Sequence, residues 1–161
     1  MELSAQLGAL LQSQQYILTT AESCTGGGVS AAITDIAGSS AWFERAFITY
    51  SNEAKMEMLD VEASTLIAHG AVSEETVTEM VLGAIKHSNA NIGVSVSGIA
   101  GPDGGSEDKP VGTVCFAWAD DSGWSKAATY CFDGDRHEVR RQAVEVAQKV
   151  LYEELSERVQ S

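Results

Sequence analysis

The sequence has few basic residues, and this shortage excludes several classes of partner. Ten Lys and Arg stand against 23 Asp and Glu, which gives a formal net charge of −13 over 161 residues. A chain with that charge is repelled by nucleic-acid backbones and by anionic membrane surfaces unless a local basic patch intervenes. We therefore expect neither nucleic acid nor a membrane among its partners.

Cysteines and long hydrophobic runs are also scarce. The three cysteines, Cys24, Cys115 and Cys131, are odd in number and contain no C-x-x-C pair, so neither a disulfide framework nor a zinc ribbon is implied. No cluster of His, Cys and Asp has metal-ligand spacing. No apolar run approaches the roughly 20 residues of a membrane helix, and the N-terminus lacks the basic leader of a signal peptide. These absences predict a cytoplasmic protein with reduced thiols and no metal.

What is present is typical of one globular domain, which we expect to span residues 1–161. Hydrophobic residues make up 44% of the chain and charged residues 20%, a balance that excludes wholesale disorder. There are only two prolines and no internal repeat, so no linker is indicated. A chain of this length buries a single good core.

Hydrophobic periodicity predicts an α/β fold. Helices are expected over 3–11, 29–36, 52–59, 74–85 and 139–151, and strands over 16–23, 45–50, 91–96, 113–118 and 125–132. The turn ADDSG joins the last two strands into an antiparallel hairpin. The expected architecture is a single layered α/β/α domain with a mixed β-sheet that includes this late hairpin. Functional loops in such sheets gather at the carboxyl ends of strands, and three loops qualify here.

The first loop, AESCTGGG, places Ser23, Cys24 and Thr25 between a strand and the N-terminus of a helix. Free backbone N–H groups and the positive end of the dipole would stabilise an oxyanion or a phosphate there. A hydroxyl at this position can act as a nucleophile. Cys24 competes for that role, because a helix start lowers the pKa of a thiol. The structural alternative is N-capping by Ser23 or Thr25, with the glycines serving the turn.

The second loop, TYSNEAK, puts Tyr50 at a strand end and Lys55 about one turn into a helix. A cation there opposes the helix dipole, and burial would lower the lysine pKa further, so Lys55 is a candidate general base. The alternative is a solvated surface lysine.

The third loop, SGIAGPDGGSEDKPVGT, contains five glycines within residues 97–112. They let the backbone approach a ligand closely, and Ser97 can hydrogen-bond a nucleophile or an amide substrate. The alternative is a mobile surface loop. Elsewhere, Arg136, Arg140 and Arg141 form the only dense basic spot, suited to a phosphate or to a helix surface paired with acids. Three histidines on separate segments leave a Ser–His–Asp triad open: His69, His87 and His137.

Five motifs in this order resemble the CinA C-terminal-domain family: AESCTGGG, ITYSNEAK, HGAVSEE, SGIAGPDGG and KPVGTVCFAW. The resemblance runs from about Ala5 to Leu155 and is closest to the stand-alone form, which lacks the larger N-terminal domain of longer members. The family's characterised activity is deamidation of nicotinamide mononucleotide to nicotinic acid mononucleotide and ammonia. Members commonly form dimers, so the resemblance implies a homodimer.

The resemblance also assigns roles to residues. The family's serine nucleophile falls on Ser23, its lysine base on Lys55 and the neighbouring tyrosine on Tyr50, which together form a Ser–Lys dyad site. Loop amides within residues 24–27 would hold the oxyanion. Protonated Lys55, directly or through Tyr50, would supply the proton that lets ammonia leave.

The implied substrate is a small-molecule nucleotide, and no cofactor is required. Ser97 stands where many members have threonine, so the hydroxyl is kept. The glycine-rich loop or Arg136 is expected to bind the phosphate. The substrate-binding residues predicted in this way are Cys24, Thr25, Gly26, Gly27, Ser97, Gly98, Gly101, Gly104 and Arg136.

Three other hypotheses remain open at the level of sequence. One is an amidohydrolase that acts on a different nucleotide or another small carboxamide. Another is a non-catalytic nucleotide-binding module that uses the same loops, which would tolerate the change Lys55→Met. The third is a cysteine hydrolase, which predicts inactivation by Cys24→Ala.

Overall fold

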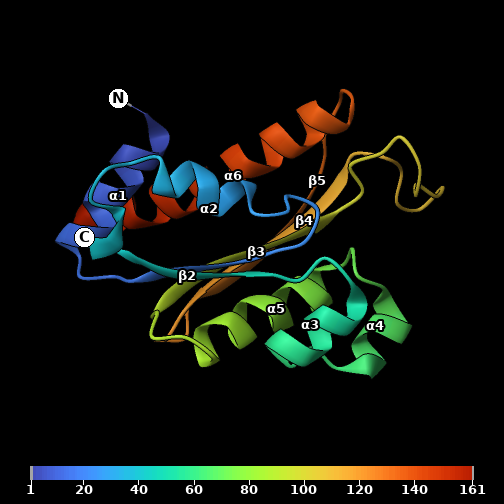
Figure 1. Ribbon diagram of the computed structural model, residues 1–161, viewed down its shortest axis with the longest axis horizontal. Helices are drawn as coiled ribbons and strands as arrows, with labels where there is room; N and C mark the ends of the chain where they lie inside the picture. The colour runs from blue at the N-terminus through green and yellow to red at the C-terminus, as the bar shows by residue number, and fades with distance from the viewer. Residues whose placement is uncertain (1, 161) are drawn as a thin grey trace.

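A computed structural model describes residues 2–160 of the chain and shows helices on both faces of a central β-sheet (Figure 1). In chain order the elements are α1 (Leu3–Ser13), β1 (Leu18–Glu22), α2 (Gly28–Thr34), the 3-10 helix η1 (Ser39–Ala41), β2 (Phe43–Ile48), α3 (Asn52–Leu59), α4 (Ala63–His69), α5 (Glu74–Lys86), β3 (Ile92–Gly98), β4 (Thr113–Asp120), β5 (Ser125–Cys131) and α6 (Arg136–Gln160). No helix within residues 2–160 combines the length and apolar character needed to cross a membrane.

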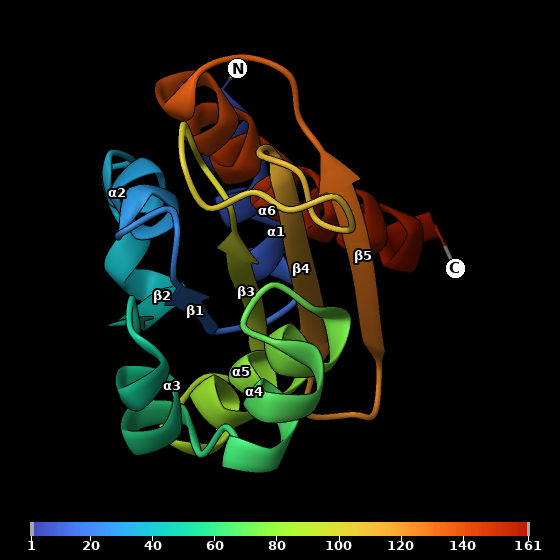
Figure 2. The same cartoon turned by 90° about the vertical axis from the view of Figure 1, so that its right-hand side faces the viewer.

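The sheet is mixed, and its five strands lie in the order β2-β1-β3-β4-β5 (Figure 2). β1 pairs in parallel with both β2 and β3, whereas β4 runs antiparallel to β3 and β5 antiparallel to β4. The predicted α/β class, the mixed sheet and the late hairpin are therefore confirmed. Parallel neighbours need a long crossover connection, so helices lie between β1, β2 and β3 along the chain. Antiparallel neighbours need only a short turn, so no helix lies between β4 and β5.

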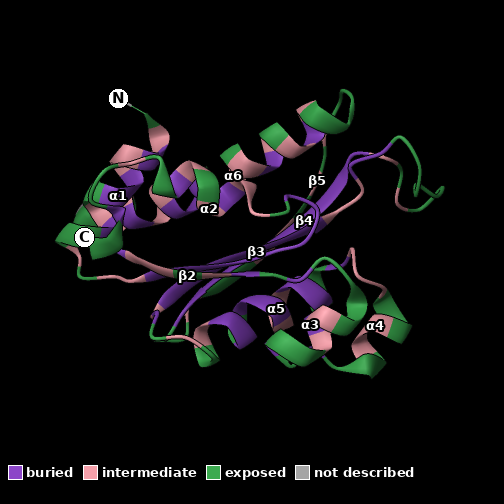
Figure 3. Cartoon of the chain, in the orientation of Figure 1, coloured by how far each residue is buried: buried purple, intermediate pink, exposed green. Residues whose placement is uncertain are grey.

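Each face of the sheet carries its own hydrophobic core. The face covered by α1, α2 and α6 buries large side chains such as Leu18, Phe116 and Trp118. The face covered by α3, α4 and α5 buries a smaller set that includes Phe47 and Met80. Burial follows this layering, with the sheet and the inward faces of the helices buried and the outer faces exposed (Figure 3).

Several elements differ from the predicted ones in their existence or their bounds. α4 and η1 were not predicted: α4 buries none of its residues, so it carries no apolar stripe. α6 begins three residues earlier and ends nine residues later than predicted, and Leu155 in the added part is fully buried. β2 is displaced two residues toward the N-terminus, from the expected 45–50 to Phe43–Ile48.

The topology brings the three candidate loops together at the carboxyl ends of the parallel strands. β1, β2 and β3 are parallel, so their carboxyl ends lie together. The chain leaves β1 toward α2 on one face and leaves β2 toward α3 on the other, which makes the end of β1 a topological switch point (Figure 1). α3 packs closely on α5: a Cβ at Gly83 would lie 1.9 Å from the carbonyl oxygen of Leu59. That close approach fixes the position of α3, the helix that carries Lys55, against α5.

Candidate active site

Ser23 and Lys55, from two different loops, lie next to each other at the carboxyl ends of the parallel strands. The Lys55 Nζ donates a hydrogen bond of 3.0 Å to the Ser23 Oγ. Ser23 directly follows β1, and its backbone N–H donates to the carbonyl of Val96 on β3. The geometry is that of a nucleophile within reach of its base.

The Lys55 side chain is buried, with 1% of its surface exposed, so the alternative of a solvated surface lysine is wrong. It lies one turn into α3, whose start is fixed by the Ser51 hydroxyl accepting from the N–H of Ala54. Its Nζ also donates to the carbonyls of Thr49, at 3.0 Å, and Tyr50, at 3.3 Å. Within residues 2–160 it forms no ion pair. Burial therefore lowers the pKa of this amine, which favours its neutral, basic form.

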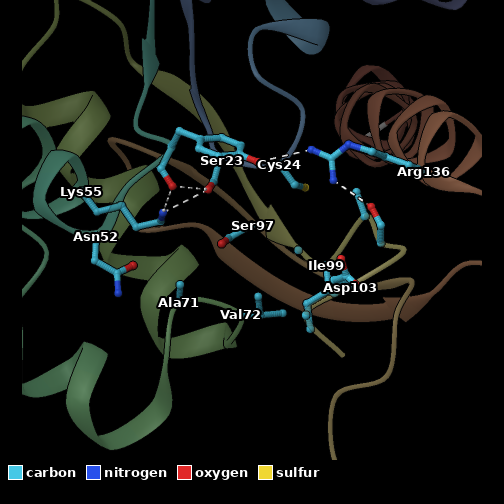
Figure 4. A pocket seen from close by; sticks show the side chains of 15 residues that line it. Ser23, Cys24, Asn52, Lys55, Ala71, Val72, Ser97, Ile99, Asp103 and Arg136 are labelled. Carbon is cyan, nitrogen blue, oxygen red and sulfur yellow. Dashed lines mark hydrogen bonds between the residues drawn. The ribbon is translucent and has the colours of Figure 1, made fainter. Parts of the chain in front are cut away.

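A cavity of about 300 Å³ lies beside the Ser23–Lys55 pair. Ser97, the next-to-last residue of β3, points into it with a hydroxyl that has no hydrogen-bond partner within the described chain (Figure 4). Gly98, Gly101 and Gly104 line the wall next to it. The volume is at the lower end of the range for small-molecule sites.

Arg136 lies on the side of the cavity opposite Lys55 (Figure 4), and Tyr50 also lines the cavity. The Arg136 guanidinium donates to the carbonyl of Gly101 at 2.8 Å and to the Tyr50 hydroxyl at 3.3 Å. The Tyr50 side chain is 63% exposed. The Tyr50 hydroxyl therefore lies beside Arg136, and the hydrogen bond that Tyr50 makes to Lys55 uses its backbone carbonyl. The cavity therefore carries a nucleophile at one side and a guanidinium at the other.

Cys24 lines the same cavity, but its thiol is not activated. Burial raises its pKa to about 11, although the N–H groups of Cys24 and Gly98 and the charge of Arg140 act in the opposite direction. The expectation that the helix start lowers this pKa is wrong, because desolvation outweighs the nearby positive charge. A thiol in this state is a poor nucleophile at neutral pH.

The N-terminus of α2 is not free, which corrects a second expectation. Glu22, with no exposed surface, accepts hydrogen bonds of 2.9 Å from the N–H groups of Val29 and Ser30. It also accepts from the hydroxyls of Thr20 and Thr25. The carboxyl group of Glu22 therefore occupies the helix end that we expected to bind an oxyanion or phosphate.

Comparison with known proteins identifies the family. The sequence profile of the CinA C-terminal domain matches residues 1–155. The chain belongs to the CinA C-terminal-domain family. It is 58% identical over 154 residues to the nicotinamide-nucleotide amidohydrolase PncC of Escherichia coli (strain K12), covering 96% of this chain and 93% of that protein.

A second relative and a solved structure agree with this assignment. The nicotinamide-nucleotide amidohydrolase PncC of Pseudomonas putida is 52% identical over 142 residues, covering 88% of each chain. Among solved structures, the competence damage-inducible protein A (ComA) from Klebsiella pneumoniae superposes with a TM-score of 0.92 at 42% identity, covering 96% of this chain and 95% of that one. The fold described above is therefore that of the CinA superfamily.

Several residues predicted for the site of this CinA domain lie outside the cavity. Thr25, Gly26 and Gly27 do not line it: the Thr25 hydroxyl donates to Glu22, and the two glycines form the turn into α2 at positive φ. None of the chain's three histidines, which all belong to its described part, lines the cavity, so none of them forms a Ser–His–Asp triad with Ser23 there.

The structure also adds residues that the sequence analysis missed. Asn52 at the start of α3 and Asp103 in the glycine-rich loop both line the cavity (Figure 4). The position of Asn52, three residues before Lys55 in the same loop, was the only available signal. Glu22 was overlooked as a functional residue, although a charged side chain ending a buried strand is unusual. Within residues 2–160, no group of three or more His, Cys, Asp or Glu is placed to hold a metal.

Proposed function

We propose that this protein hydrolyses the carboxamide of nicotinamide mononucleotide to nicotinic acid mononucleotide and ammonia through a Ser23–Lys55 dyad. The observation that carries the proposal is the 3.0 Å contact between Lys55 Nζ and Ser23 Oγ, made by a buried amine that has no ion pair within residues 2–160. The names of the PncC relatives, at 58% and 52% identity, support the choice of substrate.

In the proposed acylation step, the Ser23 Oγ attacks the carboxamide carbon while its proton moves to the neutral amine of Lys55. The carbonyl oxygen becomes an oxyanion. The N–H groups of Cys24 and Gly98 are the candidates to hold it, because both lie beside the Cys24 thiol and both residues line the cavity. They replace the α2 amides that Glu22 occupies.

Collapse of the tetrahedral intermediate breaks the carbon–nitrogen bond, and the Lys55 ammonium gives its proton to the departing ammonia. This transfer is direct, since the Tyr50 hydroxyl is hydrogen-bonded to Arg136. Lys55, again neutral, then takes a proton from a water molecule that attacks the ester. The acyl–oxygen bond breaks, the proton returns to Ser23, and nicotinic acid mononucleotide leaves.

The rest of the nucleotide is proposed to lie across the cavity toward Arg136. The Ser97 hydroxyl, free within the described chain, is placed to hydrogen-bond the carboxamide. The Arg136 guanidinium at the opposite side carries the charge that complements a phosphate.

Ammonia release from nicotinamide mononucleotide by purified protein, with a metal chelator present, tests the proposal. Wild type should release ammonia, and Ser23→Ala should lose activity by several orders of magnitude, because none of the other described residues that line the cavity is a nucleophile paired with a base. The matched control is Cys24→Ala, next in sequence, which should keep activity within a few fold because its thiol is protonated.

Two outcomes would overturn the proposal. Absence of ammonia release by folded wild-type protein that binds the nucleotide would favour a binding module or another amide. Inactivation by Cys24→Ala with full activity of Ser23→Ala would assign the nucleophile to the thiol.

A further inference from the structure

Three arginines that are neighbours in sequence near the start of α6 have different surroundings. Arg141 is exposed and pairs with Glu138 and Glu145 on the same helix. Arg136 and Arg140, one turn apart, form no ion pair within residues 2–160 and donate to backbone carbonyls instead. The interpretation as an acid-paired helix surface therefore holds only for Arg141. Acidic side chains are abundant in a chain of net charge −13, so the hydrogen bonds of these two arginines to backbone carbonyls call for an explanation other than charge pairing.

Arg140 reaches from α6 to the loop that begins at Ser23. Its Nε donates to the carbonyl of Cys24 at 3.0 Å, and its Nη2 donates to the carbonyl of Thr25 at 3.1 Å. The same guanidinium lies 3.6 Å from the position of a Cβ on Gly26. Arg140 therefore holds the Cys24–Thr25 and Thr25–Gly26 peptide groups, the second and third after the nucleophile, although it lies 115 positions from Thr25 in the sequence.

The backbone of that loop is permissive at two positions, and its internal backbone hydrogen bonds among the described residues are limited to those from the N–H groups of Gly26 and Gly28 to the carbonyls of Ser23 and Thr25. Gly26 and Gly27 both have positive φ, 57° and 104°, and glycine loses more conformational freedom on ordering than any other residue. Glu22 fixes the far end of the loop through α2. Only Arg140 among the described side chains donates to the carbonyls of Cys24 and Thr25.

We propose that Arg140 is a positioning residue of the active site, which fixes the Cys24 and Thr25 peptides and thereby the Ser23 hydroxyl against Lys55. In a trans peptide the N–H points away from the C=O, so holding the Cys24 carbonyl on the α6 side turns the Thr25 N–H away from α6. Arg140 does not line the cavity. It acts through the loop and leaves substrate contacts to Arg136 and Ser97.

Kinetics of ammonia release from nicotinamide mononucleotide test the proposal. Arg140→Ala should lower kcat about 100-fold, the loss that follows a misplacement of about 1 Å in reacting groups, and should leave KM within about threefold. Added ethylguanidinium should restore part of the lost kcat in Arg140→Ala. It should have no effect on Arg141→Ala, the adjacent control, which keeps wild-type kcat.

Three results would overturn the proposal. The first is a wild-type kcat in Arg140→Ala, and the second is an increase in KM with unchanged kcat, which would make Arg140 a substrate-binding residue. If Arg140→Ala does not fold, Arg140→Lys takes its place: it keeps the charge with a different donor geometry, so kcat should fall at unchanged KM. The third result that would overturn the proposal is a wild-type kcat in Arg140→Lys.

The proposal rests on the proposed hydrolysis, so ammonia release by wild type is measured first and tests that function alone. If wild type releases none, alkylation of Cys24 by iodoacetamide, followed by peptide mass spectrometry, tests Arg140 independently. Cys24 is 6% exposed and should react at least tenfold faster in Arg140→Ala than in Arg141→Ala. Equal rates would show that Arg140 does not hold the loop. Cys131, which is exposed, serves as the internal reference in each protein.

Discussion

At the scale of single residues, the most consequential feature is the missing acid beside Lys55. A carboxylate next to a buried amine raises its pKa and keeps it protonated, whereas desolvation alone lowers it. The chain has 23 acidic residues, yet within the described part none forms an ion pair with this amine. Its partners are two carbonyls and the Ser23 hydroxyl. The surroundings thus favour a base over a structural cation.

This arrangement predicts the pH dependence of the reaction. Lys55 must be neutral to take the Ser23 proton, so kcat/KM should rise with pH through one deprotonation. Because burial lowers the pKa of Lys55, this limb should lie below the ordinary lysine range, and activity should be lost as pH falls through it. Ammonia release measured from about pH 5 to pH 10 checks this.

A control variant identifies the group that titrates. Lys55→Met should abolish the reaction at every pH in that range. A flat profile for wild type, or substantial turnover by Lys55→Met, would contradict the role of Lys55 as base.

At the scale of elements, α2 is stabilised by a residue outside it. Its own N-cap position, Gly27, has no side chain to accept a hydrogen bond. Glu22 performs that function from the end of β1 and joins the strand to the helix across the Ser23 loop. The same carboxyl group thus caps the helix and sets the loop geometry.

Removing this cap should destabilise the fold. Glu22→Ala leaves two buried N–H groups and two hydroxyls without their acceptor, and should lower the free energy of unfolding by about 3 kcal/mol. Urea denaturation monitored by circular dichroism measures the change. Glu57→Ala, at an exposed position on α3, is the control and should stay within about 0.5 kcal/mol of wild type. Equal midpoints for the two variants would contradict the capping role.

The elements also show where sequence patterns were informative. Amphipathic helices were predictable because helical spacing marks a buried face. β4 was predictable because its continuous apolar run is typical of a strand buried on both faces, and every residue of β4 is indeed buried. α4 was not predictable, because Ala63–His69 buries nothing. The ends of α6 were misplaced for a related reason: the periodic stripe continues to Leu155 among charged neighbours that obscure it.

At the scale of the whole molecule, the homodimer implied by the family resemblance stays a prediction. The large apolar side chains that remain exposed, among them Ile48 and Ile67, are available for an interface. Sedimentation equilibrium should give twice the mass of the chain, with no dissociation at micromolar concentration. A concentration-independent mass of one chain would contradict the expectation.

The sequence by itself determined the α/β class, the three loops and the residue types that can act as nucleophile and base. It did so because periodicity reports burial, and because hydroxyl, amine and glycine patterns carry local chemistry. The family resemblance added the pairing of Ser23 with Lys55, and the tertiary structure brought the two to 3.0 Å.

Only the tertiary structure decided which groups are desolvated and which are already occupied. Local sequence indicated an activated Cys24 and a free helix end, yet burial raises the Cys24 pKa to about 11 and Glu22 takes the α2 amides. Arg140 and Arg141 are adjacent in sequence, but one holds the nucleophile loop and the other pairs with acids in solvent. Desolvation and hydrogen bonds depend on how the folded chain packs, and the partner can be far away in sequence, as with Arg140, which lies 116 positions from Cys24. No local pattern records this.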